Sequence, residues 1–284
     1  MVQPRRYVFH GNASGVAAHI RRPVDFLLPV QAASSLPTTG GLSESKAGPY
    51  SRPERRATAN NTASDYITFE SAITRAHGDY VDQEQAVAMT FGKLGFDEGP
   101  AVTTVSAEVR GLVAIGRVKV GTAALTLQAL SSDLPEPPIR CESAVLDDVS
   151  VDGYPVKITL DQEFFYENDT MTKLSAAAVE GKYPQFFFDA GTAVRYGFYN
   201  FTGMVKVTLV NSIEWAGDPH PNATIEGNSI IIPEFGKVYF AEMYVSSNSR
   251  RLTMVRFQFG SDDGGDGSAA SGDVNGSPWP PTGP

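Results

Sequence analysis

The side chains best suited to acid–base chemistry are four histidines, His10, His19, His77 and His220. Two of them have carboxylates close by in the chain, since Asp79 follows His77 and Asp218 precedes His220. An imidazole beside a carboxylate is how a general base and its orienting group are usually arranged. Both segments also contain Gly or Pro, which together with Asp are ordinary turn residues. We therefore keep His77, Asp79 and His220 as candidate catalytic residues, with simple turns as the alternative.

Glu242 is the carboxylate whose position most requires an explanation. It lies within the apolar run Val238 to Val245, so it must be exposed, paired or perturbed. Two carboxylates about 5 to 10 Å apart could hydrolyse a glycosidic bond, and the other acids that could take part are Asp161, Glu163, Glu167 and Asp189. Arg256 has a roughly opposite position in the expected partner strand, and this favours a cross-strand ion pair over a catalytic role.

The segment Tyr7 to Gly15 contains His-Gly-Asn after a short strand-like run. It resembles the loop of α/β-hydrolases whose backbone amides stabilise an oxyanion. The resemblance implies a Gly-x-Ser-x-Gly elbow and a parallel sheet, but this chain has no such elbow and no alternation of strands with long helices. The same residues lack the spacing of a phosphate-binding loop. We interpret them as a glycine turn.

No motif indicates a cofactor or a metal. Cys141 is the single cysteine, which excludes an intramolecular disulfide and a cysteine-based zinc cage. The histidines show no paired spacing on a helix. We expect neither cofactor nor metal.

Charge is distributed unevenly along the chain, whose formal net charge is -9. Residues 1–60 hold seven Arg and Lys46 against three carboxylates, a net of about +5. Such a segment could bind a polyanion, with Arg5, Arg6, Arg21 and Arg22 as candidate binding residues. It could equally dock on its own acidic body, which we favour. Nucleic acid is an unlikely partner, because few aromatic residues accompany these cations.

Composition divides the chain into three parts. Residues 1–64 are predicted to form an extended basic arm that docks partly on the body, and residues 65–260 a β-rich globular body. Residues 261–284 are predicted to form an acidic disordered tail. Trp279, alone among prolines, is a candidate for anchoring in a partner's groove.

Hairpin patterns dominate the body. Val145 to Leu160 contains Asp152-Gly153 at its centre, a pair that favours a tight turn, and residues 223–232 repeat the pattern around Gly227-Asn228. Val238 to Val245 is expected to pair with Leu252 to Phe259. Because this last hairpin is apolar on both faces, we predict that it forms the centre of the core and is covered on both sides.

Two helices are predicted within the β pattern. Asp82 with Gln85 three residues later resembles a capping box and predicts a helix over residues 83–94, and Asp169 or Thr170 can cap a helix from Met171 to Glu180. Aromatic residues gather in residues 164–166, 183–188 and 196–201. They predict a thick core, or else an apolar groove.

These features predict a mainly β protein, either an antiparallel β-sandwich or a partly closed barrel, with one or two short helices and an extended N-terminal arm. No apolar run is long enough to cross a bilayer, and no signal peptide is evident, so we expect a cytoplasmic protein. Without a catalytic constellation, the function expected is a non-enzymatic binding or assembly module, with a homo-oligomer or another protein as partner. The alternative is a carboxylate-dependent hydrolase acting on a carbohydrate or another polar small molecule. A polyanion-binding arm is a third hypothesis.

Overall fold

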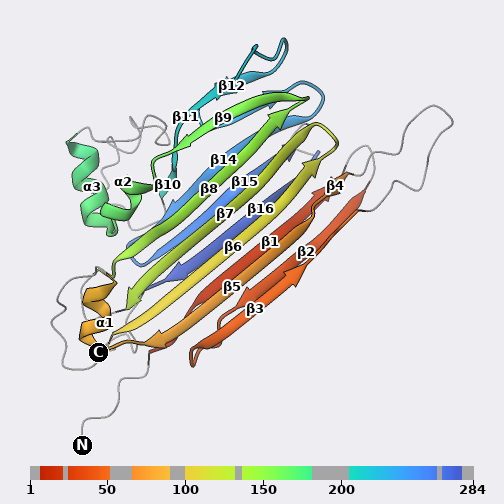
Figure 1. Ribbon diagram of the computed structural model, residues 1–284. Coiled ribbons are helices and arrows are strands. Elements are labelled where there is room, and N and C mark those ends of the chain that lie inside the picture. The colour runs from red at the N-terminus through yellow and green to blue at the C-terminus, as the bar shows by residue number, and fades with distance from the viewer. Residues whose placement is uncertain are drawn as a thin grey trace, which may run out of the picture.

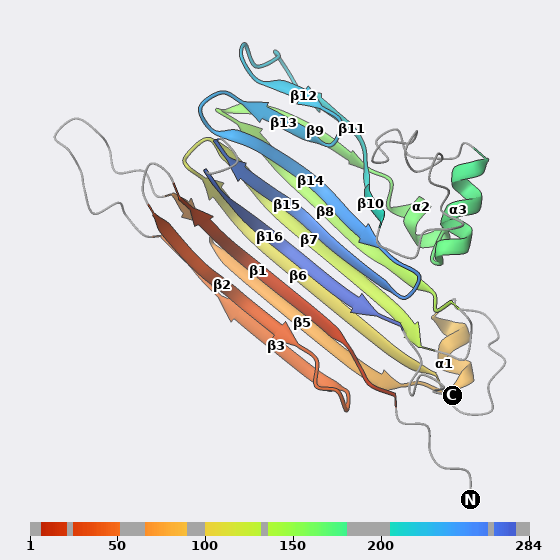
Figure 2. The same ribbon diagram turned by 180° about the vertical axis from the view of Figure 1, so that it is seen from behind.

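Two antiparallel β-sheets of eight strands each pack face to face in a computed structural model of the protein. The model describes residues 7–21, 25–51, 66–89, 100–131, 136–180, 205–260 and 264–276. Figure 1 shows one sheet in front of the other, and Figure 2 shows the pair from behind. The sheets do not close into a barrel, so the fold is the predicted antiparallel β-sandwich.

The first sheet, sheet A, has its strands in the order β12-β13-β14-β15-β16-β1-β2, and β10 pairs with β14. Their bounds are β12 (Thr224–Glu226), β13 (Ser229–Ile232), β14 (Gly236–Val245), β15 (Ser249–Phe259), β16 (Gly265–Asn275), β1 (Gly11–Ile20), β2 (Phe26–Ser35) and β10 (Val205–Thr208). In sheet A the first strand of the chain, β1, therefore pairs with the last, β16.

The second sheet, sheet B, has the order β11-β9-β8-β7-β6-β5-β3, and β4 pairs with β6. Their bounds are β11 (Val210–Trp215), β9 (Tyr154–Leu160), β8 (Ile139–Val151), β7 (Val118–Ser131), β6 (Ala101–Ala114), β5 (Ser71–Tyr80), β3 (Gly41–Ala47) and β4 (Ile67–Thr68). The core between the sheets is filled by their inward apolar side chains.

Three short helices lie beside the sheets: α1 (Gln83–Ala88), α2 (Gln162–Glu167) and α3 (Met171–Val179). The capping box of Asp82 and Gln85 begins α1 as predicted, and the Thr170 hydroxyl accepts from the Lys173 amide at the start of α3. Residues 90–94 of the first predicted helix lie outside the described residues. Helix α2 was not predicted. None of the helices in the described ranges is long and apolar enough to span a bilayer.

The predicted hairpins are confirmed. Strands β8 and β9 pair around Asp152 and Gly153, which both have positive φ as this tight turn requires. Strands β12 and β13 pair around Gly227, and β14 pairs with β15.

The N-terminal arm and the acidic tail need correction for the described residues. Strand β1 lies between β16 and β2 within sheet A, and β3 forms an edge of sheet B. Strands β1 and β16 consist largely of Gly, Ala and Ser because the sheets approach closely there. A Cβ added to Gly11 would lie 2.8 Å from Val105, and one added to Gly272 would lie 2.7 Å from Leu125. Small residues therefore mark close packing here rather than disorder.

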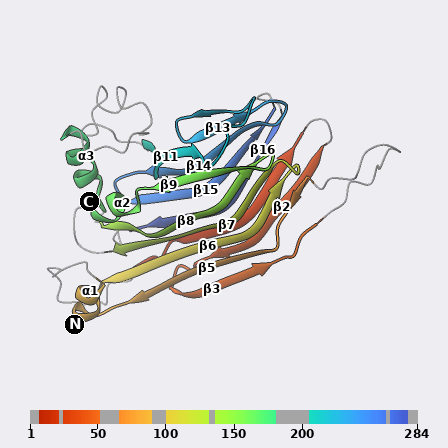
Figure 3. The same ribbon diagram turned by 45° about the horizontal axis from the view of Figure 1, so that its top comes forward.

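A row of irregular backbone crosses each sheet. In sheet A, Ala241 of β14 and Ala270 of β16 have φ of 48° and 52° at matching positions in the register. In sheet B, Asp148 of β8 and Gly111 of β6 have φ of 51° and 62°. Such residues bend strands and shift the alternation of their side chains, and the long strands bend along their length in Figure 3.

This row explains why the hairpin of β14 and β15 looked apolar on both faces. Phe240 and Ala241 are adjacent and both buried, so the inward positions change from even-numbered to odd-numbered residues at Ala241. Only one face of the hairpin packs on sheet B, while Tyr244 on the other face is exposed. The prediction that both faces are covered was wrong.

Candidate functional site

The outer face of sheet A carries polar side chains that the strand register aligns in rows. One row runs across five strands as Tyr244, Arg251, Asp273, Asn12 and Ser35, each opposite the next. The next row runs Glu242, Thr253, Ser271, Ser14 and Ala33. In both rows the side chains on β16 and β1 are smaller than those on β14 and β15, and the surface is hollow there.

Two adjoining hollows of about 420 and 470 Å³ occupy this face. They share Val30, Arg251 and Ser271, and we call them together the sheet A trough. Its polar lining residues are Asn12, Ser14, His19, Ser34, Ser35, Glu242, Tyr244, Arg251, Thr253, Arg256, Asp266, Ser268, Ser271 and Asp273. Leu27, Pro29 and Val30 of β2 add apolar surface at one side. The trough is open to solvent.

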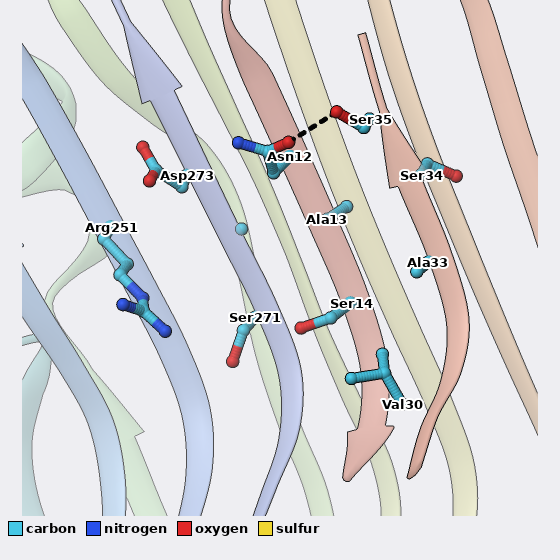
Figure 4. Close-up of a pocket in the computed structure, with 11 residues that line it drawn as sticks. Asn12, Ala13, Ser14, Val30, Ala33, Ser34, Ser35, Arg251, Ser271 and Asp273 are labelled. Carbon is cyan, nitrogen blue, oxygen red and sulfur yellow. Dashed lines mark hydrogen bonds between the residues drawn. The ribbon is translucent and has the colours of Figure 1, made fainter.

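Besides Asp266, Arg251 and Asp273 are the charged residues of the trough with unused hydrogen-bonding capacity. They lie directly opposite each other in β15 and β16. In Figure 4 the Arg251 guanidinium points toward Ser271, while the Asp273 carboxylate points away from that guanidinium. Within the described ranges, no hydrogen bond or ion pair engages either group. A ligand in the trough would therefore meet a free donor group beside a free acceptor group.

The neighbouring hydroxyl and amide groups are partly engaged with one another. Ser35 donates to the Asn12 side-chain oxygen at 2.8 Å, as Figure 4 shows. Ser271 donates to the Thr253 hydroxyl at 3.0 Å. Each keeps spare hydrogen-bonding capacity, because an amide and a hydroxyl can both donate and accept.

Glu242 forms the predicted ion pair with Arg256. Arg256 Nε and Nη2 donate to its two carboxylate oxygens at 2.5 and 3.1 Å, and Lys206 of β10 makes a further contact. The residue directly opposite Arg256 is Tyr239, whose ring lies 3.8 Å below the guanidinium. The pair is thus diagonal rather than directly cross-strand.

The Glu242 carboxylate is held ionised by these partners. Burial alone would raise its pKa, but the hydrogen bonds from Arg256 and Lys206 outweigh that effect, and the pKa lies below its ordinary value. A carboxylate that stays ionised, with both oxygens engaged, is poorly suited to act as a general acid. Its geometry is that of a structural ion pair at the margin of the trough.

His220 lies in a different part of the molecule, in the loop between β11 and β12. Its Nδ1 accepts from the backbone amides of Asn222 and Ala223, and its Nε2 lies 3.1 Å from Asp152. Arg117 also binds Asp152 through two hydrogen bonds, and these hold the pKa of Asp152 below its ordinary value. Both ring nitrogens are therefore engaged, and His220 connects the β11–β12 loop to the β8–β9 turn.

His77 and Asp79 lie on the outer face of β5 in sheet B, where both are exposed. The structure does not bring them together with Glu242 or His220. In the part of the chain that the structure describes, no three His, Cys, Asp or Glu side chains converge in a way that could hold a metal ion.

The predicted binding residues fall mostly outside the described ranges. Arg5, Arg6, Arg22 and Trp279 lie there, as do the aromatic segments 183–188 and 196–201. Arg21 is described and exposed, and its backbone amide donates to Gly264. Of the remaining aromatic cluster, Phe165 is buried in the core.

Sequence reasoning missed Arg251, Asp273, Asn12 and Ser14. Three of them lie in segments interpreted as arm or tail, and Arg251 lies between the two runs, Val238 to Val245 and Leu252 to Phe259, that were expected to pair. One signal could have revealed them. Residues 11–20 and 265–275 both alternate small buried residues with polar ones, which is typical of strands with one solvated face.

Comparison with known proteins places this architecture in a family. Residues 7–188 match the family described as Domain of unknown function (DUF8256). The chain belongs to this family. No curated protein and no solved structure matches it. The DUF8256 match includes β1 to β9, whereas β14 to β16 follow it. The trough is therefore built from strands within the match and strands beyond it.

Proposed function

We propose that this protein is a non-enzymatic binding module that holds a polar ligand in the sheet A trough. The observation that carries the proposal is the pairing of Arg251 with Asp273 across β15 and β16 without a contact between them. Opposite charges directly across two antiparallel strands attract each other and can form an ion pair. Here their hydrogen-bonding capacity remains available to a ligand.

The arrangement of the candidate catalytic residues supports binding over hydrolysis. A glycosidase would need one carboxyl group with a raised pKa close to a second carboxylate. Glu242 has a lowered pKa and two cationic partners. His77 and His220 do not line the trough. The trough thus offers recognition groups, and the imidazole that lines it, His19, is engaged by Asp25 at 2.8 Å.

Amide chemical-shift mapping tests the proposal. Isotope-labelled protein would be titrated with a panel of oligosaccharides, nucleotides and short peptides at millimolar concentration. We expect at least one probe to shift amides of β15, β16 and β1 together, and to be recovered unchanged after a day. The proposal is contradicted if no probe moves these amides, or if the bound probe is hydrolysed.

Self-assembly is a second candidate function, favoured by one edge of the sandwich. Strand β2 ends sheet A and β3 ends sheet B on the same side of the molecule (Figure 1). Leu27 and Val30 of β2 are 62% and 50% exposed, and Leu42 of β3 is 60% exposed. Among the described residues β2 and β3 each pair on one side only, and exposed apolar residues on such edge strands favour pairing with another chain.

Light scattering coupled to size-exclusion chromatography tests assembly. If this edge pairs two copies, Leu42→Lys should shift the mass from dimer to monomer. Val145→Lys is the matched control, because Val145 is also exposed but lies on β8 within sheet B. A monomer for the unmodified protein at high concentration would refute edge-mediated assembly.

A further inference from the structure

We infer that the ligand of the sheet A trough is an uncharged oligosaccharide. This inference rests on the proposed function and adds the chemical class of the ligand. Three properties of the trough lead to it: the balance of charge, the mixture of hydrogen-bonding groups, and the apolar surfaces at its sides.

The charges that line the trough nearly cancel. Two guanidinium groups, Arg251 and Arg256, stand among three carboxylates, Glu242, Asp266 and Asp273. Lys206 contacts Glu242 and compensates the third carboxylate. A polyanion would be repelled by Asp266 and Asp273, and a polycation by Arg251, so the charges that line the trough favour neither. The charge pattern favours an uncharged ligand.

The polar groups of the first row match vicinal hydroxyl groups. Arg251 can only donate and the Asp273 carboxylate can only accept, while Asn12 can do both. A sugar hydroxyl also donates and accepts at once, so it needs both kinds of partner within reach. Arg251, Asp273 and Asn12 supply them on adjacent strands. A ligand that carries only acceptors or only donors would leave part of this set unpaired, which costs affinity.

Apolar side chains lie at the β14 end of this polar row and, five to six residues along β2 from Ser35, at the other side of the trough. Tyr244 begins the row on β14 and is 37% exposed. Pro29 and Val30 of β2 are exposed on the opposite side of the trough. A pyranose ring has hydroxyl groups at its rim and C–H groups on its faces. It can therefore hydrogen-bond to the polar row while its faces pack on an aromatic ring or on aliphatic side chains.

The length of the trough favours a chain of sugars over a single one. Asp266 and Asp273 line its two ends on the same strand. Seven residues of strand separate them, which is about 23 Å at the rise of an antiparallel strand. An open trough of this length allows a chain to enter and leave sideways.

Isothermal titration calorimetry on the full chain tests the ligand class. The uncharged probes are maltohexaose, cellohexaose, laminarihexaose and fully N-acetylated chitohexaose, and the charged probes are hexagalacturonate and fully deacetylated chitosan hexamer. We expect an uncharged hexamer to bind at least tenfold more tightly than either charged hexamer. Asp273→Asn and Tyr244→Ala should each weaken that binding at least fivefold. Asp147→Asn, at an exposed position on sheet B, is the matched control and should leave it unchanged.

The other outcomes separate this inference from the proposed function. If a charged hexamer, or a nucleotide or peptide from the chemical-shift panel measured in the same way, binds more tightly and the trough variants weaken it, the ligand class is wrong while the binding function stands. If an uncharged hexamer binds but neither trough variant affects it, the site is wrong. If no probe of any class binds, both are overturned. Unfolding curves of each variant identify any loss that comes from misfolding.

Discussion

Arg250 and Arg251 are neighbours in β15, and their side chains point to opposite faces of sheet A. Arg250 is 1% exposed and donates to the backbone oxygens of Phe165 and Asn168 at 3.1 and 2.6 Å. Burial lowers its pKa to about 10. Arg251 is exposed and lines the trough. Arg250 thus binds the end of α2 to sheet A, while Arg251 remains available to a ligand.

Replacing the two arginines in turn should separate these roles. Arg250→Met leaves two buried carbonyl groups without their donor, so we expect the free energy of unfolding to fall by roughly 3 kcal/mol. Arg251→Met should change it by less than about 0.5 kcal/mol. Urea denaturation followed by circular dichroism measures both. Equal losses for the two variants would contradict the assigned burial.

Glu242→Gln should destabilise the fold without a role in chemistry. The substitution keeps the shape of the side chain but removes the charge that Arg256 and Lys206 share. We expect a loss of roughly 2 kcal/mol in the free energy of unfolding. Glu226→Gln is the control, since Glu226 pairs with Lys237 on the exposed surface and should matter much less. Unchanged stability together with lost ligand binding would show that Glu242 contacts the ligand.

Acid should remove the stabilisation that Glu242 contributes. Its pKa in the folded protein lies below the ordinary 4.5, so the folded state favours the ionised carboxylate. The contribution is complete above the unfolded pKa and disappears as the pH falls from about 4.5 through the folded value. Between pH 6 and pH 3 the unmodified protein should therefore lose more stability than Glu242→Gln. Parallel curves for the two proteins would contradict this.

The irregular row of sheet A predicts a contrast between two buried alanines. Ala241 has a φ of 48°, a conformation that glycine adopts at no steric cost. Ala107 lies in a regular part of β6 and is equally buried. Both substitutions remove one methyl group, but only Ala241→Gly also relieves backbone strain. Ala107→Gly should therefore lower the free energy of unfolding by about 1 kcal/mol more than Ala241→Gly does. Thermal or urea unfolding of both variants measures the difference. Equal losses of unfolding free energy would contradict a left-handed backbone conformation at Ala241.

Local patterns predicted the hairpins and the β-sandwich because the turn residues determine their own conformation. Asp152 and Gly153 need no distant contact to favour a tight turn. The Glu242 pair with Arg256 was also predictable, since a carboxylate in an apolar run requires a partner. Its diagonal geometry was not, because it depends on the irregular backbone at Ala241.

The trough could not be predicted because the sequences of two of its strands, β1 and β16, lack the usual features of a β-strand. Residues 11–20 and 265–275 contain few β-branched or aromatic residues, whose presence is the usual strand signal. Their small side chains are required by contacts with sheet B, as at Gly11 and Gly272. These contacts join residues more than ninety positions apart. The pairing of β1 with β16 likewise joins the two ends of the chain.

The central claim is that the outer face of sheet A is the binding surface, and filling the trough tests it most directly. Ser14→Arg places a long side chain among the residues that line the trough, while Thr126→Arg places one at a partly exposed position on β7 of sheet B. With the tightest probe of the panel, calorimetry should show at least a tenfold loss of affinity for Ser14→Arg and none for Thr126→Arg, with both variants folded. Equal affinity for the two variants, or a loss confined to Thr126→Arg, would contradict the claim.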